Sequence, residues 1–311
     1  MNRKGFEFSF GWIFAIIVGA VIIFLGIYAA TKMIGAERKV TDTEVAKQID
    51  ILLNPLSTGL EEGKTAIIQF SSETRIYNDC TLNGVFGEQK ISAATKSSIG
   101  GEAWTNQGFS SKSLNKYVFS DKIVEGKNLV VFSKPFSMPY KVGDLIFIWG
   151  DKEKFCFVNA PREIKEEIMN LKPKNIEIND SKVKCGRNST KVCFAESGCD
   201  VDVSLAQNKV SKNGKTLYYE GNLIYGAIFG DADLYECQVM RLMKRDAELA
   251  KIYKLKSESL TPKGCSSNLE GQLSAFGKKA FEMKGSGELN GLSLMAEEIR
   301  KKNDDLVCEL F

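Results

Sequence analysis

The hydrophobic pattern of the chain begins with a long apolar run close to the amino terminus. The 24 residues from Phe8 to Thr31 contain no charge, and Trp12 and Tyr28 lie near the two ends of the run. A helix of that length spans roughly 36 Å, which exceeds the roughly 30 Å core of a bilayer. A cleaved secretory signal has an apolar region of only about 7–15 residues. The run therefore predicts a single retained transmembrane helix within residues 1–35.

Small residues recur within this run at helical spacing. Gly11, Ala15 and Gly19 are four residues apart, so they lie on one face of a helix. Such a face lets a second helix approach closely, which favours self-association. The alternative is that glycine and alanine are simply common in membrane helices, and the spacing alone leaves both interpretations open.

Residues 36–63 are predicted to form a short juxtamembrane helix and a linker. Thr41 and Glu44 have the spacing of a capping box, which typically starts a helix. Val45, Ile49 and Leu52 then follow on one helical face. We expect this helix to begin after a break near Gly35 and to end at Asn54-Pro55.

Residues 64–228 have the pattern of a β-rich domain. The segment contains many short runs of β-branched and aromatic residues that are bounded by turn residues. Asn213-Gly214 is predicted to be a hairpin turn, and Pro161 to begin the one helix of the domain, with Ile164 and Ile168 on its apolar face. Residues 81–114 are polar, and we expect a long exposed loop or an irregular sheet edge there.

Residues 229–311 change to a helical period. Three successive segments carry apolar residues at alternating steps of three and four, the first broken by Asp246 and the last by Asn303. Asp233 and Glu236 have capping-box spacing at the start of the first segment. The pattern predicts an antiparallel three-helix bundle. The whole chain is thus expected to be an α+β protein with a transmembrane helix, a β-rich extracytoplasmic domain and a C-terminal bundle.

All eight cysteines follow the apolar run, and an even number is typical of disulfide bonds in an oxidising compartment. In an antiparallel bundle Cys265 and Cys308 lie at the same end, so we predict a disulfide between them. Closely spaced Cys185, Cys193 and Cys199 predict one further pair without specifying it. A zinc site is disfavoured because no two cysteines are separated by two to four residues and the chain has no histidine.

The glycosylation sequons at Asn179 and Asn188 agree with an outside location. We therefore expect a cell-membrane protein with a cytoplasmic amino terminus and an extracytoplasmic body. Membrane lipid is an expected partner, together with self-association through the transmembrane helix or the body.

The composition limits the chemistry that the body can perform. The absence of histidine removes the Ser-His-Asp and Cys-His arrangements and the commonest transition-metal ligand. Catalysis by carboxylates stays open. The net charge is +3 and no basic block stands out, so no nucleic acid is expected as a partner. No motif predicts a cofactor or a metal.

The amino-terminal sequence from Arg3 to Ser9, followed by the apolar run, resembles the class III signal of archaeal type IV pilins. The resemblance covers about 30 residues, and it implies that a prepilin peptidase cuts between Gly5 and Phe6. It also implies that the apolar helix stays to build a filament core. In that family an acidic residue usually stands fifth after the cut, whereas this chain has Phe10 there and Glu7 in second place.

The sequence therefore favours a non-enzymatic surface protein with a structural, adhesive or pilin-like assembly role. Two alternative functions stay open. One is an anchored enzyme whose carboxylates act on envelope glycans, and the other is a solute-binding ectodomain. Convergent carboxylates of raised pKa in a cleft would favour the enzyme, and an exposed apolar patch would favour assembly.

Overall fold

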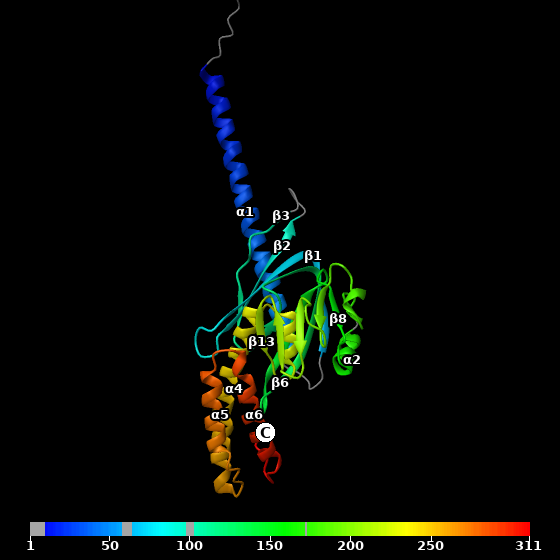
Figure 1. Ribbon diagram of the computed structural model, residues 1–311. Helices are drawn as coiled ribbons and strands as arrows, with labels where there is room; N and C mark the ends of the chain where they lie inside the picture. The colour runs from blue at the N-terminus through cyan, green and yellow to red at the C-terminus, as the bar shows by residue number, and fades with distance from the viewer. Residues whose placement is uncertain (1–9, 58–63, 98–102, 172) are drawn as a thin grey trace, which may run out of the picture.

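The computed structural model describes residues 10–57, 64–97, 103–171 and 173–311. Its first element is one continuous helix, α1 (Phe10–Ser57), whose amino-terminal part projects away from the body (Figure 1). The predicted break near Gly35 is wrong, because the apolar run and the charged segment after it belong to the same helix. α1 ends close to the predicted Asn54-Pro55.

The predicted transmembrane helix is not borne out. No helix in the described ranges is both long and apolar enough to cross a membrane. The apolar run is one end of a 48-residue helix whose other end is charged and docks on the body. The predicted membrane location is therefore not supported either. The disulfides described below indicate an extracellular protein.

The carboxyl-terminal half of α1 docks on the first of two sheets. Asp42, predicted to lie in a capping box, lies within the length of α1 and is fully buried. Its carboxylate accepts a hydrogen bond from Thr95 Oγ1 at 2.8 Å. Thr43 Oγ1 accepts one from the Phe109 N–H at 3.0 Å. Ile49 and Leu53 are fully buried against the sheet. The polar residues around position 42 thus fix α1 to the sheet rather than start a helix.

The first sheet has the strand order β3-β2-β1-β6-β7-β5, with β4 beside β2. Its strands are β1 (Lys64–Thr81), β2 (Glu88–Ser97), β3 (Ala103–Trp104), β4 (Ser111–Ser113), β5 (Tyr117–Phe119), β6 (Ile123–Ser137) and β7 (Lys141–Gly150). Residues 81–114 hold strands β2, β3 and β4, of which β3 and β4 form the edge beside β2. β2 escapes sequence detection because its buried residues Ala93 and Ala94 are small.

The second sheet has the order β13-β12-β11-β10-β8-β9, and its four strands from β11 to β9 run parallel. Its strands are β8 (Phe155–Val158), β9 (Ile176–Asn179), β10 (Thr190–Cys193), β11 (Val201–Ser204), β12 (Lys209–Lys212) and β13 (Lys215–Tyr218). The predicted hairpin turn joins β12 and β13. Asn213 and Gly214 have φ of 50° and 72° there, and positive φ at both central residues is typical of a type I′ turn.

The helices of the body are α2 (Arg162–Leu171), α3 (Leu223–Phe229), α4 (Ala232–Leu260), α5 (Glu270–Glu282) and α6 (Leu289–Asp304), with short 3₁₀ turns at Lys182–Lys184, Thr261–Lys263 and Ser286–Glu288. α2 begins after Pro161 and buries Ile164 and Ile168, as the sequence predicts. α4 is capped by Asp231, whose carboxylate accepts hydrogen bonds from the N–H groups of Asp233 and Leu234. Asp233 was the residue predicted for that role.

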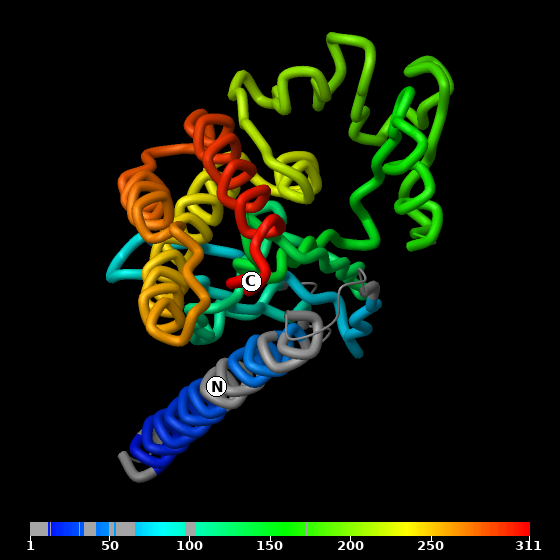
Figure 2. The backbone as a smooth tube through the Cα atoms, turned by 90° about the horizontal axis from the view of Figure 1, so that it is seen from below, coloured from blue at the N-terminus to red at the C-terminus, as the bar shows by residue number. Residues whose placement is uncertain are grey.

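The C-terminal residues do not form a three-helix bundle of their own. α4 and α5 pair closely, but α4 also contacts β1, β5 and β7 of the first sheet and β13 of the second. One continuous hydrophobic core holds residues from both sheets and from α3 to α6. Figure 2 shows α4 between α5 and the first sheet. The helices are therefore a layer on the sheets.

Buried Arg241 explains why α4 belongs to the first sheet. Its guanidinium donates hydrogen bonds to the carbonyl oxygens of Lys116 at 2.8 Å and Leu114 at 3.0 Å, in the segment that leads into β5. Burial lowers the pKa of Arg241 to about 10. Gln238, one turn earlier, donates to the Val118 carbonyl at 3.2 Å. These buried polar groups hold the helix in one register on the sheet.

All eight cysteines are joined in four disulfides. The bonds are Cys80–Cys237, Cys156–Cys185, Cys193–Cys199 and Cys265–Cys308. The pair named from the sequence, Cys265 with Cys308, is present, and the close cluster contributes the pair Cys193–Cys199. Disulfides of this number are typical of secreted or extracellular proteins.

Candidate functional site

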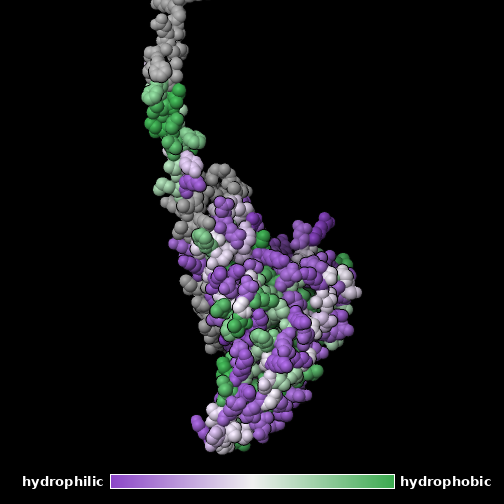
Figure 3. All heavy atoms as spheres, turned by 90° about the vertical axis from the view of Figure 1, so that its left-hand side faces the viewer, coloured by the Kyte–Doolittle hydropathy of each residue, from purple (hydrophilic) through white to green (hydrophobic). Residues whose placement is uncertain are grey.

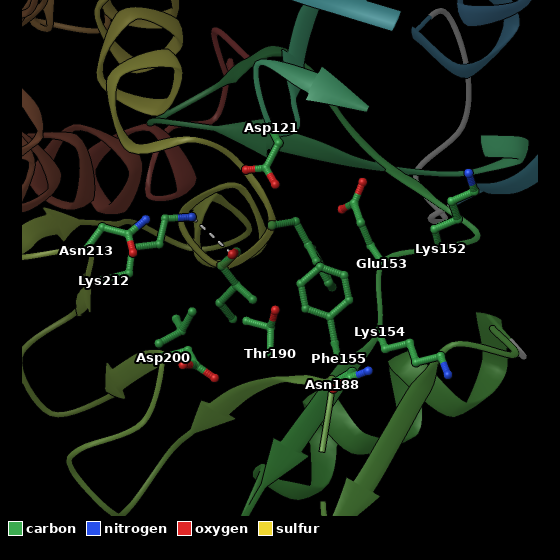
Figure 4. Close-up of a pocket in the computed structure, with 13 residues that line it drawn as sticks. Asp121, Lys152, Glu153, Lys154, Phe155, Asn188, Thr190, Asp200, Lys212 and Asn213 are labelled. Atoms are coloured by element: carbon green, nitrogen blue, oxygen red, sulfur yellow. Dashed lines mark hydrogen bonds between the residues drawn. The ribbon is translucent and has the colours of Figure 1, made fainter. Parts of the chain in front are cut away.

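A cleft lies where the chain passes from the first sheet to the second. Its cavity has a volume of about 380 Å³. The amino ends of β8, β10 and β11 form one side, through Phe155, Thr190 and Val201, and the end of α3 forms the floor, through Ile228 and Phe229. We call this space the inter-sheet cleft; Figure 4 shows its lining.

Two carboxylates reach into the inter-sheet cleft from the first sheet. Asp121 follows β5, and Glu153 lies in the connection between β7 and β8. Figure 4 shows both carboxylates directed toward the same space. Glu153 Oε1 accepts a hydrogen bond from the Gly150 N–H at 3.2 Å. Asp121 is exposed, and in the described part of the chain no group donates a hydrogen bond to its carboxylate, so water or an occupant can do so.

The pKa of each carboxyl group lies above its ordinary value. Burial raises the pKa of Glu153 to about 7; the Gly150 N–H opposes this shift, and the negative charge of Asp121 adds to it. Desolvation also raises the pKa of Asp121, while the positive charge of Lys212 lowers it in part. Near neutral pH the Glu153 carboxyl is therefore present in both the protonated and the ionised form.

Lys212 lines the inter-sheet cleft from the end of β12, and its side chain is 8% exposed. Its ammonium donates hydrogen bonds to the carbonyl oxygens of Ile228, at 3.2 Å, and Gly230. Burial lowers the pKa of Lys212 to about 8, although Asp121 and Asp231 oppose the shift. Because two carbonyls at the end of α3 already occupy this ammonium, its main role is to join β12 to α3.

The remaining polar lining comes from the second sheet and the rim. Asp200 accepts a hydrogen bond from the Lys191 N–H at 2.8 Å, and Asp202 accepts from the N–H groups of Gly198 and Cys199 at 3.0 Å each. These two carboxylates thus stabilise turns. In the described part of the chain no group of three or more acidic or cysteine side chains is arranged to hold a metal ion.

A second candidate site is the surface of α1 where it projects from the body. Most of its large apolar side chains are more than half exposed, and Figure 3 shows a hydrophobic patch on the visible face of this part of the helix. We call it the apolar α1 surface, and it consists of Trp12, Phe14, Ile16, Ile17, Val21, Ile22, Ile23, Phe24, Leu25, Ile27, Tyr28 and Met33.

The helix-packing residues predicted from the sequence lie partly on this surface. Ala15 is exposed, and a Cβ atom added at Gly19 would meet no atom within 4 Å, so this face has room for a close neighbour. Gly11 belongs to α1, but its side of the helix lies outside what the structure describes. Gly5 and Phe6, the predicted processing site, lie outside the described residues.

The predicted glycosylation residues lie in the second sheet region. Asn188 is exposed and lines the inter-sheet cleft. Asn179 is half-buried at the end of β9, and its side-chain N–H₂ lies 3.3 Å from the Cys156 sulfur. Sequence reasoning missed Asp121 and Glu153, because they are turn residues that only the arrangement of the two sheets brings together. Their acidity was the single signal available.

Comparisons with known proteins identify no relative of this chain. No protein-family model matches the chain, and no curated protein or solved structure matches it significantly.

Proposed function

We propose that this protein is an extracellular, non-enzymatic assembly subunit that associates with copies of itself through the apolar α1 surface and displays the disulfide-stabilised body. One observation carries the proposal. The projecting part of α1 exposes large apolar side chains, among them Trp12, Phe24 and Met33, which are 66%, 68% and 67% exposed. Apolar patches larger than a few hundred Å² typically mark interaction sites.

The distribution of these side chains favours identical helices as the occupant. Ile22, Ile23, Phe24 and Leu25 are consecutive and all exposed, so apolar groups point to every side of the helix. A partner with a single groove would cover only one side of such a helix. Several copies of α1 packed side by side can cover all of them.

Small residues on α1 support close packing between copies. A Cβ atom at Gly19 or at Gly26 would meet nothing within 4 Å, so neither glycine is required by contacts inside one chain. Glycine at helix surfaces lets the backbones of two helices approach closely. The positions are therefore suited to contacts between chains.

The resemblance of the amino terminus to archaeal type IV pilins points the same way. In that family the apolar helix forms the filament core after cleavage of the signal. Applied to this chain, the resemblance proposes a cut between Gly5 and Phe6 and a filament whose surface consists of the body. The lack of histidine agrees with a structural rather than a catalytic role.

The proposal is tested by following the assembly of the full chain. We expect the protein to form large assemblies at micromolar concentration in sedimentation velocity and electron microscopy. Ile22→Lys places a charge in the apolar α1 surface and should leave the protein monomeric, because a buried unpaired ammonium is costly. Protein from its native cells should begin at Phe6.

Leu294→Lys is the matched control. Leu294 lies on α6 and is 58% exposed, close to the 63% of Ile22, but it belongs to the body. This variant should assemble like the unchanged protein. A monomeric unchanged protein, or assembly of the Ile22→Lys variant to the same extent, would contradict the proposal.

A further inference from the structure

The inter-sheet cleft has the properties of a binding site that the assembly role does not use. Its cavity of about 380 Å³ is at the lower end of the roughly 300–1,000 Å³ of small-molecule pockets. Its floor is apolar, with Ile228 and Phe229 beside the ring of Phe155, and most of its other lining residues are polar. The cavity is thus large enough for one small ligand that has both an apolar face and polar edges.

The two carboxylates of the inter-sheet cleft, Asp121 and Glu153, can accept hydrogen bonds from a ligand. The Asp121 carboxylate accepts no hydrogen bond from the described part of the chain, and one oxygen of Glu153 accepts a single one from Gly150. Figure 4 shows both groups directed into the cavity. An occupant that only accepts hydrogen bonds, such as phosphate, would face both carboxylates and would be repelled.

Three lysine ammonium groups in the lining disfavour a purely cationic ligand. Lys152 and Lys154 lie at the rim, and the buried Lys212 ammonium lies within the lining. Their positive charges oppose an entering amine. The side-chain amides of Asn188 and Asn213 offer donors and acceptors at the same rim. The lining as a whole therefore suits a ligand whose groups donate and accept equally well.

Hydroxyl groups donate and accept hydrogen bonds without carrying a charge, and a sugar presents several of them around one ring. We infer that the inter-sheet cleft binds a neutral carbohydrate the size of a mono- or disaccharide, with sugar hydroxyls donating to Asp121 and Glu153 and a ring face on the apolar floor. The mixed protonation of Glu153 near neutral pH is compatible with this role, since a carboxyl group can then donate to a ring or hydroxyl oxygen as well as accept.

The inference is independent of assembly through α1, because the inter-sheet cleft lies within the body. The test uses the Ile22→Lys variant, made in a host without N-glycosylation so that Asn188 carries no sugar. Glucose, mannose, N-acetylglucosamine and their disaccharides are titrated by calorimetry and by saturation-transfer NMR. Spermidine and inorganic phosphate are the cationic and anionic probes.

We expect at least one saccharide to bind and neither charged probe to do so. Asp121→Asn and Glu153→Gln should each weaken saccharide binding about tenfold, because each replaces a carboxylate acceptor by a neutral amide oxygen that accepts more weakly. Both changes keep the shape of the side chain, and neither residue is fully buried, so the fold should persist. Glu297→Gln, an exposed carboxylate on α6, is the matched control and should leave the affinity unchanged.

Three outcomes would overturn the inference. They are failure of every saccharide to bind, binding of spermidine that is lost or of phosphate that is strengthened in Asp121→Asn, and unchanged saccharide affinity in both cleft variants. None of them bears on assembly, which the Ile22→Lys comparison tests separately.

Discussion

At the scale of single residues, Asp246 places a carboxyl group in the core. Its side chain on α4 is fully buried, and neither carboxyl oxygen accepts a hydrogen bond in the described part of the chain. Burial raises the pKa of Asp246 well above its ordinary value, and the nearby Tyr140 hydroxyl offsets only part of this shift. The folded protein therefore holds this carboxyl in its neutral form across a wide pH range.

This shift predicts a stability that falls as the pH rises. The folded state keeps the Asp246 proton above pH 4, whereas the unfolded chain releases it, so the free energy of unfolding decreases by about 1.4 kcal/mol per pH unit until the folded pKa is reached. Asp246→Asn removes the titrating group. Urea unfolding between pH 4 and 8 should show a flatter profile for the variant. Parallel profiles would contradict the assigned protonation state.

At the scale of elements, the docking of α1 on the first sheet depends on one glycine. A Cβ atom at Gly108 would lie 2.8 Å from the Thr43 nitrogen and 2.9 Å from the Asp42 carbonyl carbon, both in the backbone of α1. A rigid backbone cannot move away as a flexible side chain can. The loop before β4 and the helix approach each other this closely only because position 108 has no side chain.

Gly108→Ala should therefore loosen α1 from the sheet. We expect a loss of about 1–3 kcal/mol in the free energy of unfolding, the usual cost of overpacking. Gly271→Ala is the matched control, because a Cβ atom there would meet nothing within 4 Å inside α5. That change should stabilise the protein by about 0.5–1 kcal/mol. Denaturant unfolding measures both, and equal effects of the two changes would refute the packing argument.

The individual elements also show which features can be predicted from the sequence and which cannot. Local patterns such as the Asn213-Gly214 turn and the helix after Pro161 depend on nearby residues, so they could be predicted. The capping-box interpretation of Thr41 to Glu44 failed because Asp42 and Thr43 bind residues more than fifty positions away, Thr95 and Phe109. Asp121 and Glu153 meet for the same non-local reason, and no spacing announces them.

At the scale of the whole molecule, the disulfides divide into those that join layers and those that close local loops. Cys80–Cys237 joins β1 to α4 across 157 residues of sequence, whereas Cys193–Cys199 spans only 6. The first bond lies in the same contact between α4 and the first sheet as Arg241 and Gln238. It therefore fastens the helical layer to the sheet, while the second only shapes the turn between β10 and β11.

This difference predicts unequal losses when the bonds are removed in pairs. On the loop-entropy model, closing the long loop stabilises the folded state by about 5 kcal/mol and closing the short one by about 2 kcal/mol. The Cys80→Ser/Cys237→Ser protein should therefore unfold at clearly lower denaturant concentration than the Cys193→Ser/Cys199→Ser protein. Because only the first bond holds α4 against β1, hydrogen exchange in α4 should also rise in the first variant and not in the second. Equal midpoints together with unchanged exchange in α4 would show that buried polar contacts such as those of Arg241 hold the layers together without the covalent link.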